Sequence, residues 1–204
     1  TSSSSSNDNH YSDQTRKSLA NIDESLVNYE LIEQLVAYIL KSNTHQGGSL
    51  LIFAPGADEI SKICQTLSTS TKLQQSSASS SLRILPLHGG LPPTQQSRVF
   101  DRPPPNVIKI VVSTNVAETS ITIDDATVVI DTGRVKEMRF DSQRGIARLQ
   151  EAWVSQASAQ QRRGRAGRVR PGVCFRLFSK KKTWGKNMSK DSPPEVLRAP
   201  LHGL

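Results

Sequence analysis

The chain has 204 residues, of which 35% are hydrophobic and 22% are charged. This apolar content suffices for one buried core and excludes a wholly disordered protein. The formal net charge of +8 favours a polyanionic partner, because Lys and Arg that neutralise phosphates release condensed counterions. A basic balance also serves solubility alone, so charge by itself leaves nucleic-acid binding open.

Cysteine usage and hydropathy favour an intracellular protein. Cys64 and Cys174 form neither a disulfide framework nor a CxxC pair, and each lies in an apolar run where a buried thiol would pack. No apolar run approaches the roughly 18 residues that cross a bilayer, and the N-terminus lacks a signal-peptide pattern. We expect a protein of the cytoplasm or nucleus, with no membrane contact and no metal ligands of its own. Because the chain opens at Thr1 and closes inside an apolar pattern, we take it for a piece of a longer protein.

The polarity of the chain predicts a tail followed by one domain. Residues 1–22 are rich in Ser, Asn and Asp, and they cannot bury enough apolar surface to offset the entropy of ordering. We expect a flexible linker there and a single domain over 23–192. A second polar stretch, 68–81, is predicted as a surface loop insertion.

Apolar runs in the central part predict an α/β fold. Over 28–41 the apolar residues recur at the spacing of a helix that packs by one face. Continuous apolar runs bounded by turn residues predict strands at 49–54, 82–87, 107–113, 126–131 and 173–178. Polar or helical stretches at 57–67, 93–100 and 155–165 lie between them, which is typical of βαβ units on a mainly parallel sheet. Ligands of such folds meet the loops after the carboxyl ends of the strands.

Two further extended segments, 135–140 and 146–154, are joined by the polar turn 141–145. We predict a β-hairpin that projects from the domain. A plain surface hairpin is the alternative.

The segment 161–168, QRRGRAGR, carries four arginines and two glycines. Glycine costs about 1 kcal/mol relative to Ala inside a helix, so the segment should end a helix and present guanidinium groups. Arg165 and Arg168 are three residues apart and can point the same way. Guanidinium forks suit phosphate oxygens, and an arginine aimed at a transferring phosphoryl group can contribute about 10³ to 10⁵ in rate. A basic nucleic-acid-binding or nuclear-localisation patch is the other interpretation.

QRRGRAGR resembles motif VI of superfamily 2 helicases in its DEAH/RHA form, QRxGRAGR, with every fixed position present. The resemblance implies a RecA-like domain: three α/β/α layers, a mainly parallel central sheet and a projecting β-hairpin. It also implies three catalytic residues. Gln161 would act at the γ-phosphate and the attacking water, and Arg165 and Arg168 would be arginine fingers.

STNVAETSITI at 113–123 looks like motif V of the same family. A cluster of Thr, Asn and Ser after a strand is, by itself, often a capped turn. By the resemblance, Thr114, Asn115 and Thr122 would contact the RNA backbone, and Ser120 would lie near the nucleotide. Asp124 would bind the ribose and orient Arg168.

LIFAPGADEI at 51–60 is similar to motif IV, with Ala54 where Leu is usual. Pro55 and Gly56 end a predicted strand and open a helix whose free amides could meet phosphate. Both are expected RNA-binding residues.

Three other segments extend the resemblance. LHGGLPPTQQSRVF at 87–100 resembles a segment whose last aromatic, here Phe100, stacks on the adenine. VVIDTG at 128–133 fits the strand after motif V and adds Gly133 to the expected nucleotide-binding residues. The hairpin matches one that the family directs toward RNA leaving the motor, and we expect Arg144 in its turn to contact RNA.

PEVLRAPL at 194–201 resembles the family's lead into a winged-helix domain, so 193–204 is expected to begin that connection. The chain has no GxxxxGK[ST] loop and no DExH box, which bind phosphates and Mg²⁺. The resemblance therefore implies ATP with Mg²⁺, the Mg²⁺ held mainly by a first RecA-like lobe that this chain lacks. The implied partners are single-stranded RNA, that lobe and the winged-helix domain in cis, and possible protein activators.

The resemblance implies an ATP-dependent RNA helicase that translocates 3′ to 5′, of which this chain alone would be inactive. Two other functions stay open. A degenerate relative could be a non-catalytic RNA-binding module that keeps the basic surface, or an adaptor whose helicase core only positions partners. Loss of Gln161, Arg165 or Arg168 would favour them, but all three are present.

Overall fold

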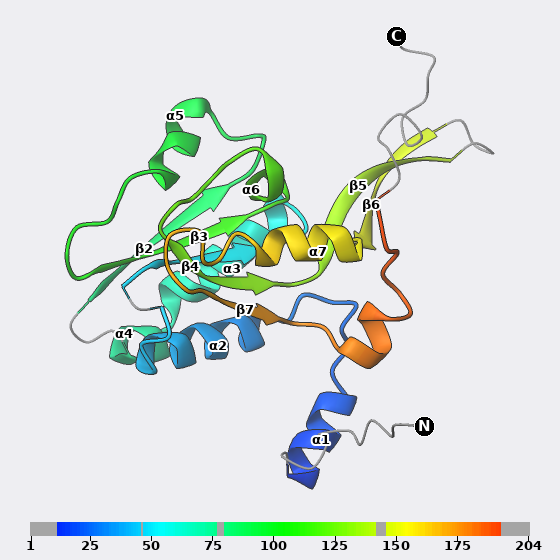
Figure 1. Cartoon of the computed structure of the whole chain (residues 1–204), viewed down its shortest axis with the longest axis horizontal. Helices are drawn as coiled ribbons and strands as arrows, with labels where there is room; N and C mark the ends of the chain where they lie inside the picture. The colour runs from blue at the N-terminus through cyan, green and yellow to red at the C-terminus, as the bar shows by residue number, and fades with distance from the viewer. Residues whose placement is uncertain (1–11, 46, 77–79, 142–145, 193–204) are drawn as a thin grey trace.

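Figure 1 shows the computed structural model of the chain, which describes residues 12–45, 47–76, 80–141 and 146–192. Arg144 and the expected winged-helix connection at 193–204 lie outside these ranges. Within them, no helix is long and apolar enough to cross a membrane.

A five-stranded parallel sheet forms the centre of the domain. Its spatial order is β2-β3-β1-β4-β7, and β1 pairs with both β3 and β4. The strands lie within two residues of the predicted boundaries: β1 (Ser49–Phe53), β2 (Ser81–Leu87), β3 (Val107–Ser113), β4 (Ala126–Asp131) and β7 (Val173–Arg176). The prediction of an α/β fold with a mainly parallel sheet is confirmed.

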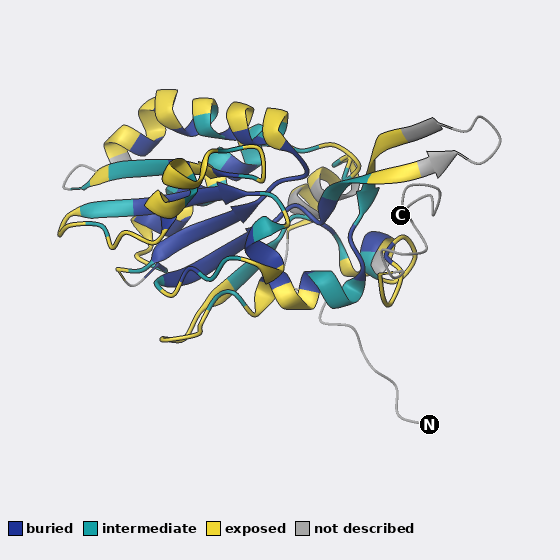
Figure 2. Ribbon diagram, turned by 90° about the horizontal axis from the view of Figure 1, so that it is seen from above, coloured by how far each residue is buried: buried dark blue, intermediate teal, exposed yellow. Residues whose placement is uncertain are grey.

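Alternate side chains of the buried strands pack into two hydrophobic cores, one on each face of the sheet. In β1, Leu50 and Ile52 pack with α2 (Tyr29–Lys41) and α3 (Ala57–Thr69). Leu51 and Phe53 belong to the opposite core, on the side of α6 (Val116–Thr119) and α7 (Gln156–Arg163). The central strands are accordingly buried along their length, with helices on both faces (Figure 2). The three-layer RecA-like arrangement is confirmed.

Two helices lie where polar composition predicted none. Thr71–Ser76 forms α4, with Leu73 fully buried against the core, so the prediction of a surface loop is wrong for this part of 68–81. Its one large apolar side chain is enough to seat the turn. Asp13–Ala20 forms α1 inside the stretch expected to be a linker, whose flexibility stays a prediction.

The predicted hairpin is confirmed as β5 (Arg134–Asp141) and β6 (Ile146–Trp153), an antiparallel pair that projects from the carboxyl end of the sheet (Figures 1 and 2). Two backbone hydrogen bonds hold its root. Lys136 N donates to Pro55 O at 3.0 Å, and Val154 N donates to Gly133 O at 2.9 Å.

Shorter helical pieces complete the fold. Before β3 the chain forms α5 (Pro93–Gln96) and one 3-10 turn (Ser97–Val99), and after β7 it forms a π-helical turn (Lys180–Trp184). The 3-10 turn buries Val99 and leaves Phe100 beyond it 54% exposed.

Candidate functional site

The arginine-rich segment is a helix end followed by a tight loop, as predicted. Ser155 caps the start of α7 by accepting from Ser158 N at 3.0 Å, and the helix ends at Gly164. Gly167 has φ +87°, a left-handed conformation that favours glycine, and its amide donates to Ala126 O at 3.3 Å. This bond fixes the loop beside the start of β4.

Arg165 and Arg168 both reach back to the segment that resembles motif V. Arg165 donates to Glu118 O, to Ile121 O at 3.4 Å and to Thr122 Oγ1 at 3.5 Å. Arg168, which is exposed, donates to Thr122 Oγ1 at 3.0 Å. The structure therefore pairs Arg168 with Thr122, where the sequence predicted Asp124.

The electrostatics of Arg165 reflect its crowded position. Burial lowers the pKa of Arg165, the nearby charge of Arg168 lowers it further, and Glu118 acts in the opposite direction. Both guanidinium groups donate to Thr122 Oγ1, so they form one cationic site. Such a site suits a polyanion.

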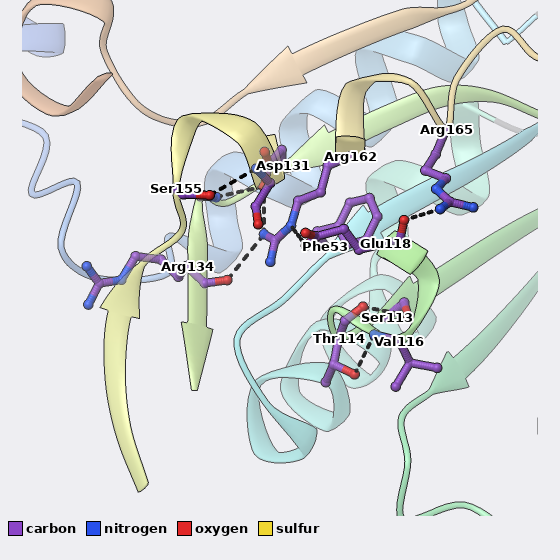
Figure 3. A network of polar contacts seen from close by, with 12 residues as sticks. Phe53, Ser113, Thr114, Val116, Glu118, Asp131, Arg134, Ser155, Arg162 and Arg165 are labelled. Carbon is purple, nitrogen blue, oxygen red and sulfur yellow. Dashed lines mark hydrogen bonds and ion pairs between the residues drawn. The ribbon is translucent and has the colours of Figure 1, made fainter. Parts of the chain in front are cut away.

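Arg162 is the most buried charged group of the segment, and sequence reasoning gave it no role of its own. Its Nε donates to Glu118 Oε2 at 3.0 Å, its Nη1 donates to Asp131 Oδ1 at 2.9 Å, and its guanidinium lies 4.8 Å from the centre of the Phe53 ring (Figure 3). Its side chain is 0% exposed. We call Phe53, Glu118, Asp131 and Arg162 the Arg162 cluster. It joins α6, α7, β1 and the end of β4.

The cluster also reaches the hairpin. Arg162 Nη1 donates to the carbonyl oxygen of Arg134, the first residue of β5, at 3.3 Å (Figure 3). Two buried carboxylates against one guanidinium make its removal costly, because the remaining charges would lose their partner in a dry environment. The cluster thus connects the arginine-rich segment to the segment that resembles motif V and to the first residue of the hairpin.

The remaining motif V candidates lie at the end of β3. Thr114 is half buried, and its Oγ1 accepts from Val116 N at 3.5 Å, the capped turn that its residue type suggested (Figure 3). Asn115 and Ser120 are exposed at the two ends of α6. Gln161 is exposed on α7, immediately before buried Arg162.

Pro55 and Gly56 are buried, unlike the exposed motif V candidates. Lys136 of β5 lies over them: a Cβ added to Gly56 would come within 2.7 Å of its side chain, and its Nζ pairs with Glu59 at 2.8 Å. The hydrogen bond and the charge of Glu59 outweigh burial and raise the pKa of Lys136. RNA contact at Pro55 and Gly56 stays a prediction, and it would require Lys136 to move aside.

Gly133 is not brought together with the other nucleotide candidates. It follows the carboxyl end of β4, whereas Asp124 and Arg168 lie near the amino end of that strand. Its φ is +71°, and an added Cβ would lie 2.5 Å from the Phe178 ring. The structure thus gives this glycine a conformational reason that is independent of any ligand.

Phe100 and Asp124 stand at the amino edge of the sheet. Asp124 is exposed and lines a cavity of about 190 Å³ with Arg102, Val169 and Arg170, so the loop after Phe100 and the loop after Arg168 meet there. The lone lysine of the apolar run 107–113, Lys109, is fully buried beside this edge. It is the second charged residue whose role the sequence did not reveal.

Cys64 and Cys174 are free and half buried, and burial raises the pKa of each thiol to about 11. Both are therefore protonated at neutral pH and behave as core residues. Within the described ranges, no group of three or more His, Cys, Asp or Glu side chains could hold a metal ion.

Comparison with known proteins shows the family of the chain. The model of the helicase conserved C-terminal domain matches residues 29–170. A DExH-box ATP-dependent RNA helicase of Arabidopsis thaliana, DExH1, is 43% identical over 194 residues, covering 95% of this chain and 19% of that protein. The putative ATP-dependent RNA helicase DHX57 of Homo sapiens is 43% identical over 189 residues, covering 92% of the chain and 14% of that protein.

A solved structure shares the fold. The crystal structure of the E. coli DExH-box NTPase HrpB superposes with a TM-score of 0.72 at 33% identity, covering 85% of this chain and 20% of that one. The fold and the arginine segment define the chain as a RecA-like helicase domain. It belongs to the helicase conserved C-terminal domain family, in the DEAH/RHA (DExH-box) group. The chain spans about a fifth or less of these relatives.

Proposed function

We propose that the chain is the second motor lobe of an ATP-dependent RNA helicase, in which Arg165 and Arg168 act as arginine fingers. The observation that carries this proposal is the pairing of both arginines with Thr122. The same segment supplies Thr114 and Asn115 to the proposed RNA track. One loop system would therefore respond to nucleotide and to RNA.

ATP would bind between this lobe and a first RecA-like lobe, with Phe100, Ser120 and Asp124 on the near side. When the lobes close, water attacks the γ-phosphorus and the bond to the β–γ bridging oxygen breaks, releasing ADP and phosphate. Gln161 would orient the water, and Arg165 and Arg168 would stabilise the charge that develops on the phosphoryl oxygens. Mg²⁺ would be held mainly by the first lobe and would supply charge neutralisation at the phosphates.

Movement along RNA would follow from opening and closing of the cleft between the two lobes. The Arg162 cluster joins α7 to α6 and to the root of the hairpin. When Arg165 and Arg168 close on phosphate, the proposed RNA-binding residues would therefore move together with them. Repeated cycles would shift the grip on single-stranded RNA, in the 3′ to 5′ direction. The first lobe, a winged-helix domain in cis and protein activators are the proposed partners, in the cytoplasm or nucleus.

The test is ATP hydrolysis by the full-length protein that we propose contains this chain. Arg168→Ala should lower RNA-stimulated kcat by about a hundredfold or more, because it removes charge stabilisation in the transition state. Arg163→Ala is the matched control: it removes an exposed arginine of the same segment and should change the rate by less than about twofold.

Other outcomes separate the alternatives. Equal rates for the two variants would refute the finger assignment. A full-length protein that binds RNA but hydrolyses no ATP would establish a non-catalytic RNA-binding module or adaptor in place of the motor.

A further inference from the structure

Lys109 is a fully buried cation, the third residue of β3, between apolar neighbours. Its side chain is 0% exposed. A lysine in such a place is costly unless every donor of the ammonium group is satisfied, because the charge has lost its water. The partners of Lys109 Nζ therefore indicate what the residue holds.

The ammonium group has three donors and three oxygen partners. Lys109 Nζ donates to Val99 O at 2.7 Å and to Asp101 O at 3.0 Å, and it lies 2.9 Å from Asp125 Oδ1. We call Val99, Asp101, Lys109 and Asp125 the Lys109 clamp. It joins the loop before β3 to the loop before β4.

Two partners of the clamp are the carbonyl oxygens on either side of Phe100. Val99 is itself buried, whereas Phe100 is 54% exposed. The lysine thus holds the backbone of an aromatic residue that the protein leaves in solvent. An exposed ring on a tethered backbone is presented in one place, which lowers the entropy lost when a flat ligand stacks on it.

The third partner fixes the other side of the same edge. Asp125 O accepts from Ser49 N at 2.8 Å, which ties this loop to the start of β1. Its neighbour Asp124 is exposed and lines the cavity of about 190 Å³ together with Arg102, two residues after Phe100. The clamp thus connects the loop before β3 and the loop before β4, both of which line this cavity.

We infer that Lys109 is a positioning residue that fixes the loop carrying Phe100 relative to the loop carrying Asp124, and so determines the affinity for the base and sugar of the nucleotide. It touches neither nucleotide nor RNA. The inference rests on the proposed function, since it takes Phe100 and Asp124 as nucleotide-binding residues. The inference adds that different residues control KM and kcat. Lys109 would affect the binding of ATP, whereas Arg165 and Arg168 would affect the rate of the chemical step.

The test compares Lys109→Met with the wild type in the full-length protein. Methionine keeps most of the side-chain volume and removes the three donors. We expect KM for ATP to rise about tenfold, the effect of losing a charged hydrogen-bond anchor, with kcat at saturating ATP within about twofold. RNA affinity measured without nucleotide should be unchanged. Lys109→Arg should recover part of the affinity, because it restores a buried cation.

Epistasis with Phe100 separates positioning from general damage. Phe100→Ala should raise KM for ATP by itself, and Lys109→Met added to it should raise KM by much less than it does in the wild type. If Lys109→Met raises KM by the same factor in the Phe100→Ala background as in the wild type, the inference is overturned. A fall in kcat with KM unchanged would also overturn it. Asp125→Asn, which weakens the clamp at a residue with 24% side-chain exposure, gives the same test with a smaller expected rise if Lys109→Met does not fold. A wild-type protein without ATP hydrolysis would refute the proposed function itself.

Discussion

The two ends of the sheet are each held by a buried cation, but in different ways. At the carboxyl end, Arg162 lies between two carboxylates and against an aromatic ring, and its partners are themselves nearly or fully buried. At the amino edge, Lys109 binds two backbone carbonyls and one carboxylate that is 24% exposed. The first arrangement ties secondary-structure elements together, whereas the second ties loops that carry exposed side chains.

This difference indicates that the Arg162 cluster and the Lys109 clamp have different roles. Guanidinium groups can bridge several elements with a planar fork, so Arg162 serves as a rigid joint between α6, α7 and the hairpin. An ammonium group is a compact point charge, which suits the convergence of three oxygens from nearby loops. We expect damage at the Arg162 cluster to appear chiefly as lost stability, and damage at the Lys109 clamp chiefly as lost ligand affinity.

The largest expected effect is at Arg162. Arg162→Met would leave Glu118 and Asp131 buried without their cation, and it should lower the free energy of unfolding by about 3–5 kcal/mol. Urea denaturation of the chain measures this loss. Arg163→Met, at the exposed neighbouring position, should change stability by less than about 0.5 kcal/mol. Equal losses in the two variants would show that the Arg162 cluster does not hold the carboxyl end together.

A smaller loss is expected at the hairpin root. Gly133→Ala would force a Cβ against the Phe178 ring at 2.5 Å in a backbone with φ +71°, and it should destabilise the chain by about 2–3 kcal/mol. Gly89→Ala is the control, since its Cβ would meet nothing within 4 Å. If both substitutions leave the unfolding midpoint unchanged, the packing of the root is looser than the structure indicates.

The smallest expected effect lies at the amino edge and depends on pH. His45 is 7% exposed, and burial lowers its pKa below the ordinary value of 6.5, although the hydrogen bond that its ring donates to the backbone of Ile39 acts the other way. The unfolded chain therefore binds the proton more readily, so stability falls as pH drops below about 6.5, by at most about 1.4 kcal/mol per pH unit for one proton. Unfolding measured between pH 7.5 and 5 should show this loss.

His45→Gln removes the titrating group and is the matched comparison. The variant should show a flatter dependence of stability on pH over the same range, because the carboxylates titrate mostly below it. An unchanged slope would mean that His45 is not the group that links the amino edge to pH.

Much of the fold could be predicted from the sequence, because apolar runs report burial directly. Strand β3 matches the predicted 107–113, and the helix at 28–41 begins at Tyr29 with Asn28 as its cap. The failure at α4 has the same origin: a single buried Leu73 among polar residues gives no periodic signal. Composition averages over a segment, whereas one side chain can seat a helical turn.

The site could be predicted only as far as motifs identify residue types. The motifs predict Arg165 and Arg168 at the nucleotide and Thr122 at the RNA, and in the structure each arginine is hydrogen-bonded to Thr122. Other features depend on partners that are distant in sequence and could not be predicted. They are the pairing of Arg168 with Thr122, the burial of Pro55 and Gly56, and the roles of Arg162 and Lys109. A lysine inside an apolar strand was a visible signal, but the sequence did not show which oxygens it binds.

The measurement that tests the account most directly is RNA-stimulated ATP hydrolysis by the full-length protein and by the isolated 204-residue chain at the same salt concentration. If the chain is a second motor lobe, the full-length protein hydrolyses ATP faster with single-stranded RNA, and the isolated chain, with no phosphate-binding loop in its sequence, hydrolyses none. Hydrolysis by the isolated chain, or RNA binding by the full-length protein without any ATP turnover, would contradict the account.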